Sequence, residues 1–216
     1  MKTSALTLFF LLSATAAKAE DFMPHAGDMT VRVGGADVAF ASGAKISLAG
    51  QRIPGASLKL SDNVTATAQF AYFVTPHVSM SLTVGLPPET NATGVGVLAP
   101  LGRLGSVRYG PAAALVNYNF TPLGRIMPWV GVGPTYMVVF SNKDAAIQHL
   151  NVDSHWGAAV QAGAEYRFDR RWGLYASASK LFLHTDGSGT FSGLPIKAKI
   201  DLNPFVFQSG VTFHFR

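Results

Sequence analysis

The chain has 216 residues, no cysteine and a formal net charge of +5, and only 13% of its residues are charged. Soluble domains usually carry roughly 25% charged residues, and 48% of this chain is hydrophobic, so the composition excludes a disordered protein and is unusual for a soluble one. Beyond residue 20 no run approaches the ~18 apolar residues of a membrane-spanning helix, which leaves a β-rich protein of one domain.

Residues 1–19 have the pattern of a cleaved signal peptide. Lys2 supplies the positive charge, residues 5–12 form an apolar run too short to span a membrane, and Ala17 and Ala19 frame a small-residue cleavage site. Cleavage leaves residues 20–216 as the mature domain and removes two lysines, so the net charge falls from +5 to +3. The remaining basic residues are scattered, which excludes nucleic acid as a partner.

The mature chain is dominated by hydrophobic residues that alternate with small or polar ones, the pattern of β-strands. The predicted strands cover residues 29–40, 63–74, 77–85, 107–120, 126–140, 154–168, 172–185 and 205–215. Strand 126–140 is apolar on both faces, so its inward face is undecided. In other strands aromatic residues gather at the ends of the apolar face, where a lipid-facing strand carries its interfacial girdle. The predicted interfacial aromatics are Trp156, Tyr166, Phe168, Phe213 and Phe215.

Short and long connections alternate strictly along these strands. The short ones are 75–77, 121–125 and 169–171, and the long ones are 41–62, 86–106, 141–153 and 186–196. This order predicts an all-β, eight-stranded antiparallel up-and-down transmembrane β-barrel with short periplasmic turns and long outer loops. A soluble barrel of lipocalin type is the alternative, but it needs a polar outer face. Residues 78–85 carry no charge on either face, which favours the membrane.

Five stretches of the mature chain carry a family resemblance. They are 127–133 (MPWVGVG), 153–163 (DSHWGAAVQAG), 171–172 (RW), 202–207 (LNPFVF) and 213–215 (FHF). In this order they resemble the OmpW family of small bacterial outer-membrane β-barrel proteins. The resemblance implies insertion by the barrel-assembly machinery and passage of small, mostly hydrophobic molecules across the outer membrane, with lateral exit through the wall. Such barrels usually finish on an aromatic residue, whereas here Arg216 follows Phe215.

The second face of each strand lines the lumen, which eight strands leave just wide enough for side chains or one small ligand. Small inward residues such as Gly163 are expected to leave free volume. The predicted apolar lining, mostly toward the outer half, is Leu115, Met137, Tyr175, Leu181, Leu183 and Val206. The predicted polar lumen at the periplasmic end is Glu165, Arg167 and His214.

Two functions are compatible with this lumen. An ion-selective pore lines its constriction with charged rings, whereas inward charge here is limited and lies at the periplasmic end, so the lining favours a channel for small hydrophobic molecules. We expect solute to enter between the outer loops and to be stopped by the polar residues at the periplasmic end. The alternative is a structural or surface-interaction protein, such as a receptor or antigen, whose lumen is closed by its own side chains.

Motifs for metals, cofactors and catalysis are weak. The six histidines lack the spacing of zinc sites, so no metal or cofactor is predicted. His184, Asp186 and Ser188 are close in sequence, but a catalytic triad is recognised by geometry, and no enzymatic activity is predicted. The basic residues of the long connections are either solvated charges or contacts for the phosphates of lipopolysaccharide. They are Lys45, Arg52, Lys59, Arg103, Lys143, Lys197 and Lys199.

Overall fold

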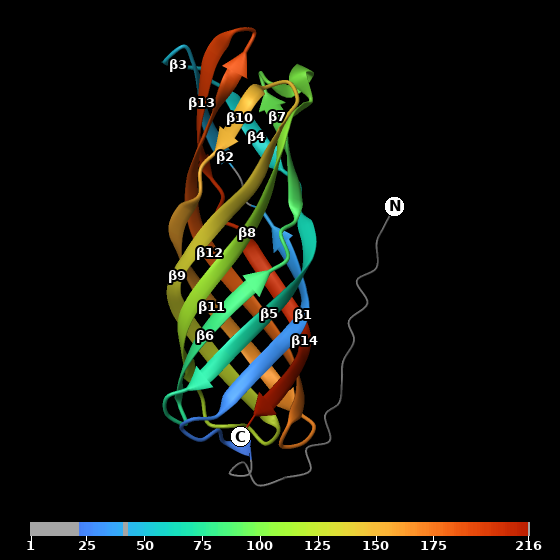
Figure 1. Cartoon of the computed structure of the whole chain (residues 1–216), viewed down its shortest axis with the longest axis vertical. Coiled ribbons are helices and arrows are strands. Elements are labelled where there is room, and N and C mark those ends of the chain that lie inside the picture. The colour runs from blue at the N-terminus through green and yellow to red at the C-terminus, as the bar shows by residue number, and fades with distance from the viewer. Residues whose placement is uncertain (1–21, 41–42, 216) are drawn as a thin grey trace.

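The computed structural model describes residues 22–40 and 43–215, which form a closed antiparallel β-barrel that continues at one end into an extension of further strands (Figure 1). The predicted signal peptide and Arg216 lie outside the described residues. The barrel strands are β1 (Met29–Ala39), β5 (Asn63–Phe73), β6 (Val78–Gly85), β8 (Arg103–Asn119), β9 (Ile126–Asp144), β11 (His155–Arg167), β12 (Trp172–Phe191) and β14 (Phe205–Phe215). Their order around the wall is β11-β9-β8-β6-β5-β1-β14-β12, and pairing of β11 with β12 closes the ring. The predicted eight-stranded barrel is therefore confirmed.

Side chains alternate between the lumen and the outer surface along every barrel strand, because successive Cβ atoms of a strand point to opposite faces. On β11, Trp156 and Val160 are exposed on the outside, whereas Gln161 and Glu165 are buried inside. β9, whose two faces are both apolar in sequence, turns Trp129 inward and leaves Val130 and Val132 outside. The hydrophobic face of the barrel wall thus points outward, as a lipid environment requires.

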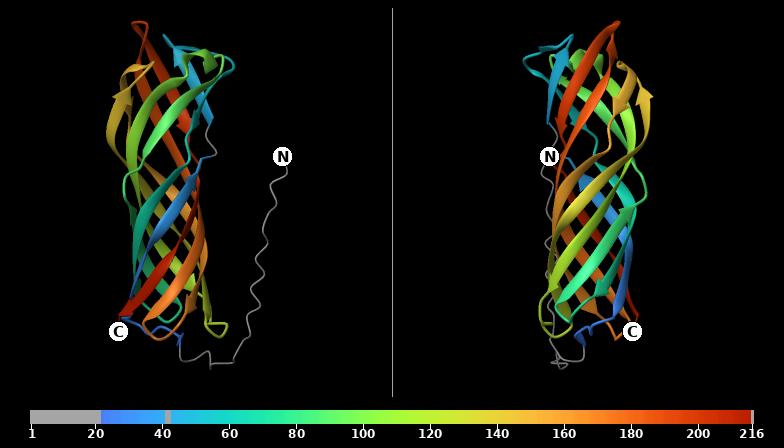
Figure 2. Two further views of the ribbon diagram at one scale, coloured as in Figure 1. Left: turned by 90° about the vertical axis from the view of Figure 1, so that its right-hand side faces the viewer. Right: turned by 60° about the vertical axis from the view of Figure 1, so that its left-hand side comes forward.

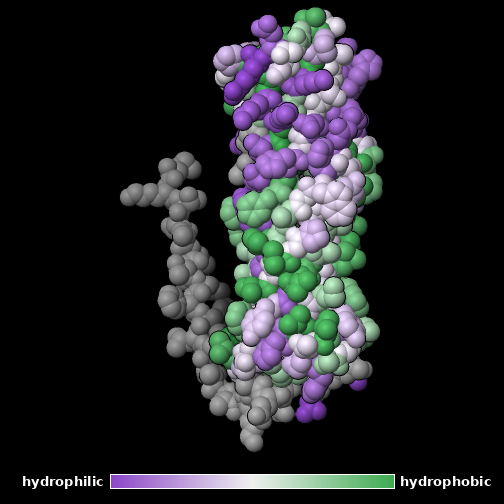
Figure 3. All heavy atoms as spheres, turned by 90° about the vertical axis from the view of Figure 1, so that its left-hand side faces the viewer, coloured by the Kyte–Doolittle hydropathy of each residue, from purple (hydrophilic) through white to green (hydrophobic). Residues whose placement is uncertain are grey.

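Hydrophobic side chains gather over the barrel, whereas hydrophilic ones dominate the extension above it (Figure 3). Short turns join β5 to β6, β8 to β9 and β11 to β12 at the lower end, which we call the periplasmic end. In the β11–β12 turn, the Asp169 carboxylate accepts hydrogen bonds from the backbone N–H groups of Arg171 and Trp172 at 2.7 and 2.8 Å. Among the described residues, no helix combines the length and hydrophobicity needed to cross a bilayer.

The four long connections, predicted as loops, contain strands, which corrects that expectation (Figure 2). The added elements are β2 (Gly43–Leu48), β3 (Gln51–Arg52), β4 (Ala56–Leu60), β7 (Glu89–Gly96), the short 3-10 helix η2 (Ala99–Leu101), β10 (Gln148–Val152) and β13 (Leu194–Asp201). They pair with one another and with the upper parts of β8 and β12. Their outer faces meet water and carry charges, so the hydrophobic alternation that marks the barrel strands is weaker here.

Candidate functional site

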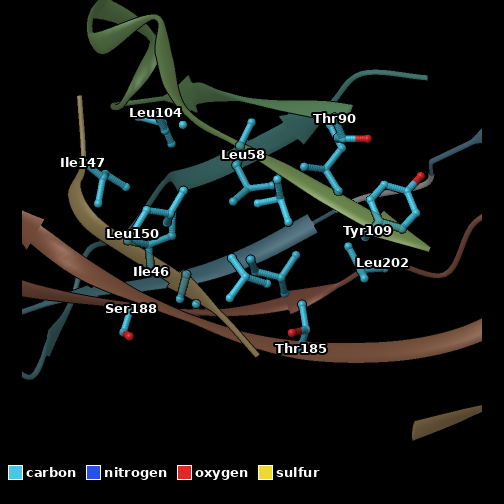
Figure 4. A pocket seen from close by; sticks show the side chains of 18 of the residues that line it. Ile46, Leu58, Thr90, Leu104, Tyr109, Ile147, Leu150, Thr185, Ser188 and Leu202 are labelled. Carbon is cyan, nitrogen blue, oxygen red and sulfur yellow. The ribbon is translucent and has the colours of Figure 1, made fainter. Parts of the chain in front are cut away.

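An apolar cavity of about 80 Å³ lies inside the extension, where strands from different connections turn their inward side chains toward one another (Figure 4). Ile46 comes from β2, Leu58 from β4 and Leu104 from β8. Ile196 of β13 and Ile147, just before β10, belong to the same hydrophobic lining. We call this space the upper cavity. Because its walls belong to the connections that were predicted as loops, the sequence pattern did not reveal it.

A second space of about 60 Å³, the lower cavity, lies within the barrel itself. Phe40, Tyr109, Met137 and Leu202 line both cavities and therefore separate them. The rings of Phe40 and Tyr109 meet edge to face with their centroids 5.9 Å apart. Any molecule that moves from the upper to the lower cavity passes this pair, which we call the Phe40–Tyr109 passage.

A layer of amide side chains forms the floor of the lower cavity. Gln161 donates from Nε2 to Oε1 of Gln208 at 3.3 Å and accepts at its own Oε1 from Nε2 of Gln69, also at 3.3 Å. Ser177 and Ser179 accept further hydrogen bonds from Gln161. All five side chains are buried, so the floor is a satisfied polar layer below apolar walls.

A buried charged cluster lies beneath the amide floor at the periplasmic end. Glu165 is fully buried and contacts His214 at 2.5 Å, Arg167 at 3.2 Å and Arg32 at 3.4 Å. Arg167 also donates from Nη1 to the backbone carbonyl of Phe22 at 2.7 Å, which ties the chain before β1 across the barrel end. The predicted polar lumen of Glu165, Arg167 and His214 is therefore placed together, and it fills the lumen.

Arg32 is the member of this cluster that sequence reasoning missed. It donates to Gln69 at 2.8 Å, so it links the amide floor to Glu165, and its guanidinium lies 4.1 Å from the ring centre of Trp129. β1 contains Gly34 and Gly35, which weaken its hydrophobic alternation. The sequence pattern therefore did not show that Arg32 and Thr30 point to the same, inward face. A charge on a membrane strand was the available signal, because such a charge must face inward and find partners.

Five of the six predicted path residues surround the lower cavity. They are Leu115, Met137, Leu181, Leu183 and Val206. Tyr175 lines neither cavity and lies instead 6.0 Å from the Arg32 guanidinium. The expected free volume beside Gly163 is also absent, because a Cβ there would overlap the ring of Trp129. The sequence shows that a residue is small but not what faces it across the lumen.

The predicted interfacial aromatics all lie on the outer surface at strand ends. Trp156 contacts Tyr136 at the outer end, with ring centroids 4.7 Å apart. Ring pairs at the periplasmic end join Tyr166 to Phe168 and Phe213 to Phe215, at 5.7 and 4.6 Å. Aromatic rings at the two ends of an apolar band are the arrangement that anchors a barrel at the two membrane interfaces.

The barrel wall is interrupted between β6 and β8. Pairing of β6 with β8 ends at Val84, and pairing of β7 with β8 starts at Glu89, with Pro87 and Pro88 in the gap. Opposite them, Pro111 of β8 also lacks an N–H group. Across this gap the backbone hydrogen bond is Tyr109 N–H to the carbonyl of Pro88, at 3.3 Å. We call this interruption the proline seam, and it borders the lower cavity through Pro88 and Pro111.

The predicted basic residues lie on the extension in different settings. Lys45 and Lys199 are exposed on the paired strands β2 and β13 and stand directly opposite each other. Lys143 instead pairs with Glu89 at 2.7 Å. Hydrogen bonds from Lys143 and Ser106 lower the pKa of the Glu89 carboxyl. Lys143 therefore stands apart, whereas Lys45, Arg52, Lys197 and Lys199 lie on the neighbouring strands β2, β3 and β13, where Lys45 and Lys199 are directly opposite each other.

Comparison with known proteins agrees with this architecture. The chain is 35% identical over 186 residues to the dibenzothiophene metabolism operon protein PahQ of Pseudomonas aeruginosa, covering 86% of this chain and 88% of PahQ. It is 29% identical to the outer membrane protein AlkL of Ectopseudomonas oleovorans, over 79% of this chain and 74% of AlkL. The crystal structure of the outer membrane protein OprG from Pseudomonas aeruginosa matches with a TM-score of 0.84 at 22% identity, covering 91% of this chain and all of OprG. The OmpW family model matches residues 25–215, and the chain is an outer-membrane β-barrel protein that belongs to the OmpW family.

Proposed function

We propose that this barrel passes small, uncharged hydrophobic molecules from the cell exterior into the outer membrane. The observation that carries the proposal is the stack of two apolar cavities above a sealed polar floor. Among the residues that the structure describes, none that lines either cavity is charged, so neither cavity would replace the hydration shell of an ion. A hydrophobic solute gains free energy at each step inward, roughly in proportion to the apolar surface it removes from water.

Exit through the wall is the second part of the proposal. Below the lower cavity the solute meets the amide floor and the cluster around Glu165, which are buried and fill the lumen. The proline seam borders the same cavity and contains few backbone hydrogen bonds, so it opens at a smaller cost than a fully paired part of the wall. A molecule that leaves there enters the lipid directly.

The relatives support this substrate class. PahQ and the Pseudomonas protein DoxH are named as proteins of dibenzothiophene metabolism operons, and dibenzothiophene is an uncharged aromatic compound. Each is 35% identical to this chain over 86% of its length. The proposed role is transport without catalysis. A structural or surface protein with a permanently closed lumen is the competing function.

Uptake by cells that lack other members of the family separates the two functions. We expect cells that carry the wild-type protein to take up labelled dibenzothiophene faster than cells without it. Met137→Trp fills the region between the two cavities and should abolish the gain, whereas Val132→Trp places the same side chain on the lipid face of the same strand and should preserve it. Both variants are first checked for folding by the heat-dependent gel mobility of barrels. Equal uptake with and without the wild-type protein would favour the closed-lumen function.

We also propose that the Lys45–Lys199 pair contacts phosphate groups of lipopolysaccharide. Like charges directly opposite on paired strands repel each other. Lys199 also stands opposite Asp186 of β12, but neither lysine forms an ion pair among the described residues. Binding of phosphorylated lipid A to the purified protein should weaken in a Lys45→Glu/Lys199→Glu variant. The matched control, Lys59→Glu/Arg103→Glu, alters the same net charge on β4 and β8 and should bind normally. Equal loss in both variants would contradict a site at this pair.

A further inference from the structure

An acidic side chain, Asp37, lies on the lipid-facing side of the barrel wall. It belongs to the outward face of β1 and stands directly opposite Phe207 of β14 and Val64 of β5. Its carboxylate forms no ion pair or side-chain hydrogen bond among the described residues. The exposed ring of Phe205 is two residues nearer the outer end of β14, so the carboxylate lies below an aromatic residue of the apolar surface. A charge on the lipid face of a barrel is costly, so Asp37 calls for a partner.

A basic side chain lies on the same outer surface, two strands away. Lys180 of β12 stands directly opposite Phe205 of β14 and alternates with the buried Ser179 and Leu181, so it points outward. Its ammonium group donates to the backbone carbonyl of Asn203 at 2.6 Å and lies 4.0 Å from the centre of the Phe205 ring. Both contacts are with uncharged groups. Within the part of the chain that the structure describes, the positive charge therefore has no counter-ion.

A hollow of about 670 Å³ lies in the outer surface beside both charges. Asp37 lines it, and Lys180 follows Ala178 of its lining by two residues. Gly35 of β1 and Ser209 of β14 are directly opposite each other in the same hollow, so its floor consists of small side chains on neighbouring strands. Small residues let the backbones of two membrane segments approach closely, which is how packing in lipid gains contact energy.

The two charges stand at nearly the same height in the membrane. Seen from outside, the strands rise to the right toward the outer end, and β14 lies below and to the right of β1 (Figure 1). Strands of such a barrel rise about 3.3 Å per residue, lie about 4.8 Å apart and tilt by about 40°. With these values and the observed register, Asp37 and Lys180 differ in height by only about 1–2 Å.

This arrangement of charges selects the molecule that covers the hollow. An amine-bearing lipid or a divalent cation would neutralise Asp37 but not Lys180, and an acidic lipid would do the reverse. A second copy of the chain supplies both signs at once. Two copies in one membrane share their orientation, so a two-fold axis between them runs along the membrane normal and brings β1 of each against β12 of the other. Asp37 then meets the partner's Lys180 at the same height.

We propose that the protein forms a two-fold symmetric dimer through the outer surface of β1, β14 and β12. Two equivalent ion pairs join Asp37 to the partner's Lys180, and the hollows of the two copies pack against each other between these pairs. Lipid around the interface keeps water away from the ion pairs and so strengthens their attraction. The proline seam between β6 and β8 lies on the opposite side of the ring and stays in contact with lipid. The dimer is therefore independent of the proposed transport function.

Engineered cysteines test the dimer directly, because the native chain contains no cysteine. Ala178→Cys places a thiol in the hollow, near the proposed two-fold axis. The matched control is Ala114→Cys, on the exposed face of β8 at the opposite side of the ring. Each variant is checked for folding by heat-dependent gel mobility, reconstituted in phosphatidylcholine vesicles over a range of protein-to-lipid ratios, and oxidised. We expect a disulfide-linked dimer with Ala178→Cys and only background cross-linking with Ala114→Cys.

Reversal of the charges tests the proposed ion pairs. In the Ala178→Cys protein, Asp37→Lys places two lysines opposite each other and should lower the dimer affinity by at least about tenfold. Addition of Lys180→Asp restores opposite charges in exchanged positions and should recover the cross-linking. Equal cross-linking of Ala178→Cys and Ala114→Cys would overturn the dimer and leave a lipid as the molecule that covers the hollow. An unchanged affinity in folded Asp37→Lys, or no recovery in the folded double reversal, would overturn the ion pairs on which the proposal depends.

Discussion

Replacing Glu165 by glutamine tests whether the buried cluster is held together by charge. The side chain is fully buried and contacts Arg32, Arg167 and His214 within 3.4 Å. Glutamine preserves the shape but removes the negative charge, so two guanidinium groups remain buried without a counter-ion. Breaking a buried ion pair in this way costs about 3–5 kcal/mol, and we expect the free energy of unfolding to fall by that amount. The exposed pair between Glu89 and Lys143 provides the contrast, because water screens it and its loss should have little effect on the free energy of unfolding.

Urea unfolding of the protein in lipid vesicles, followed by tryptophan fluorescence, measures this difference. Trp129 is buried and lies 4.1 Å from the Arg32 guanidinium, so its emission reports on the cluster directly. A second variant, Glu165→Gln combined with Arg32→Met, removes one of the stranded charges and should recover part of the loss. The two changes would then couple by more than about 1 kcal/mol in a double-mutant cycle. A loss below about 1 kcal/mol for Glu165→Gln, or purely additive effects, would refute the reasoning.

Three further predictions concern the seam, the lumen and a turn. Pro111→Ala restores an N–H group on the edge of β8 that faces the proline seam. Uptake of hydrophobic solutes should then fall, and the free energy of unfolding should rise by about 1 kcal/mol. An unchanged uptake rate would argue against exit through the proline seam. Leu181→Ala should lower the free energy of unfolding by about 2–4 kcal/mol because it enlarges a cavity in the lumen. Leu82→Ala, on the lipid face, should lower it less, because lipid chains refill the space. Equal losses in unfolding experiments would contradict the faces assigned to these two residues. Hydrogen bonds from two backbone N–H groups in the β11–β12 turn lower the pKa of the Asp169 carboxyl. The charged carboxylate therefore stabilises the fold at any pH above the ordinary aspartate pKa. This contribution is lost as the pH falls through the lowered pKa of the folded state. Asp169→Asn should therefore be less stable than the wild type at pH 7, and the gap in melting temperature should close in acid; a gap that is constant with pH would disprove this.

The barrel could be predicted from the sequence because its main signal is local. A residue and its neighbour two positions along point to the same side of a strand, so Trp156, Val160 and Glu165 reveal their faces without knowledge of any other strand. The strict alternation of short turns with long connections then determines the order of the strands. Where both faces are apolar, as around Trp129, the local signal is missing and the direction depends on what lies across the lumen.

The candidate site was only partly predictable, because its contacts join residues far apart in the chain. Arg32 and Glu165 are separated by 133 positions and meet because β1 and β11, which are not neighbours in the wall, both turn these side chains into the lumen. The same distance in sequence explains why the position of Tyr175 beside Arg32 and the space that Trp129 occupies beside Gly163 were not predicted. The upper cavity went unseen for a related reason, since it forms where separate connections pair above the membrane.

The amino-acid sequence by itself determined the class of fold, the membrane-facing surface and the inward side of most strands. These follow from the period of two and from the free energy of placing apolar side chains in lipid, and both act residue by residue. The tertiary structure alone decided which inward side chains meet, where space remains between them and where the wall lacks hydrogen bonds. Closing the sheet into a ring fixes the register of all strands relative to one another at the same time. The sequence of a single strand does not determine this register.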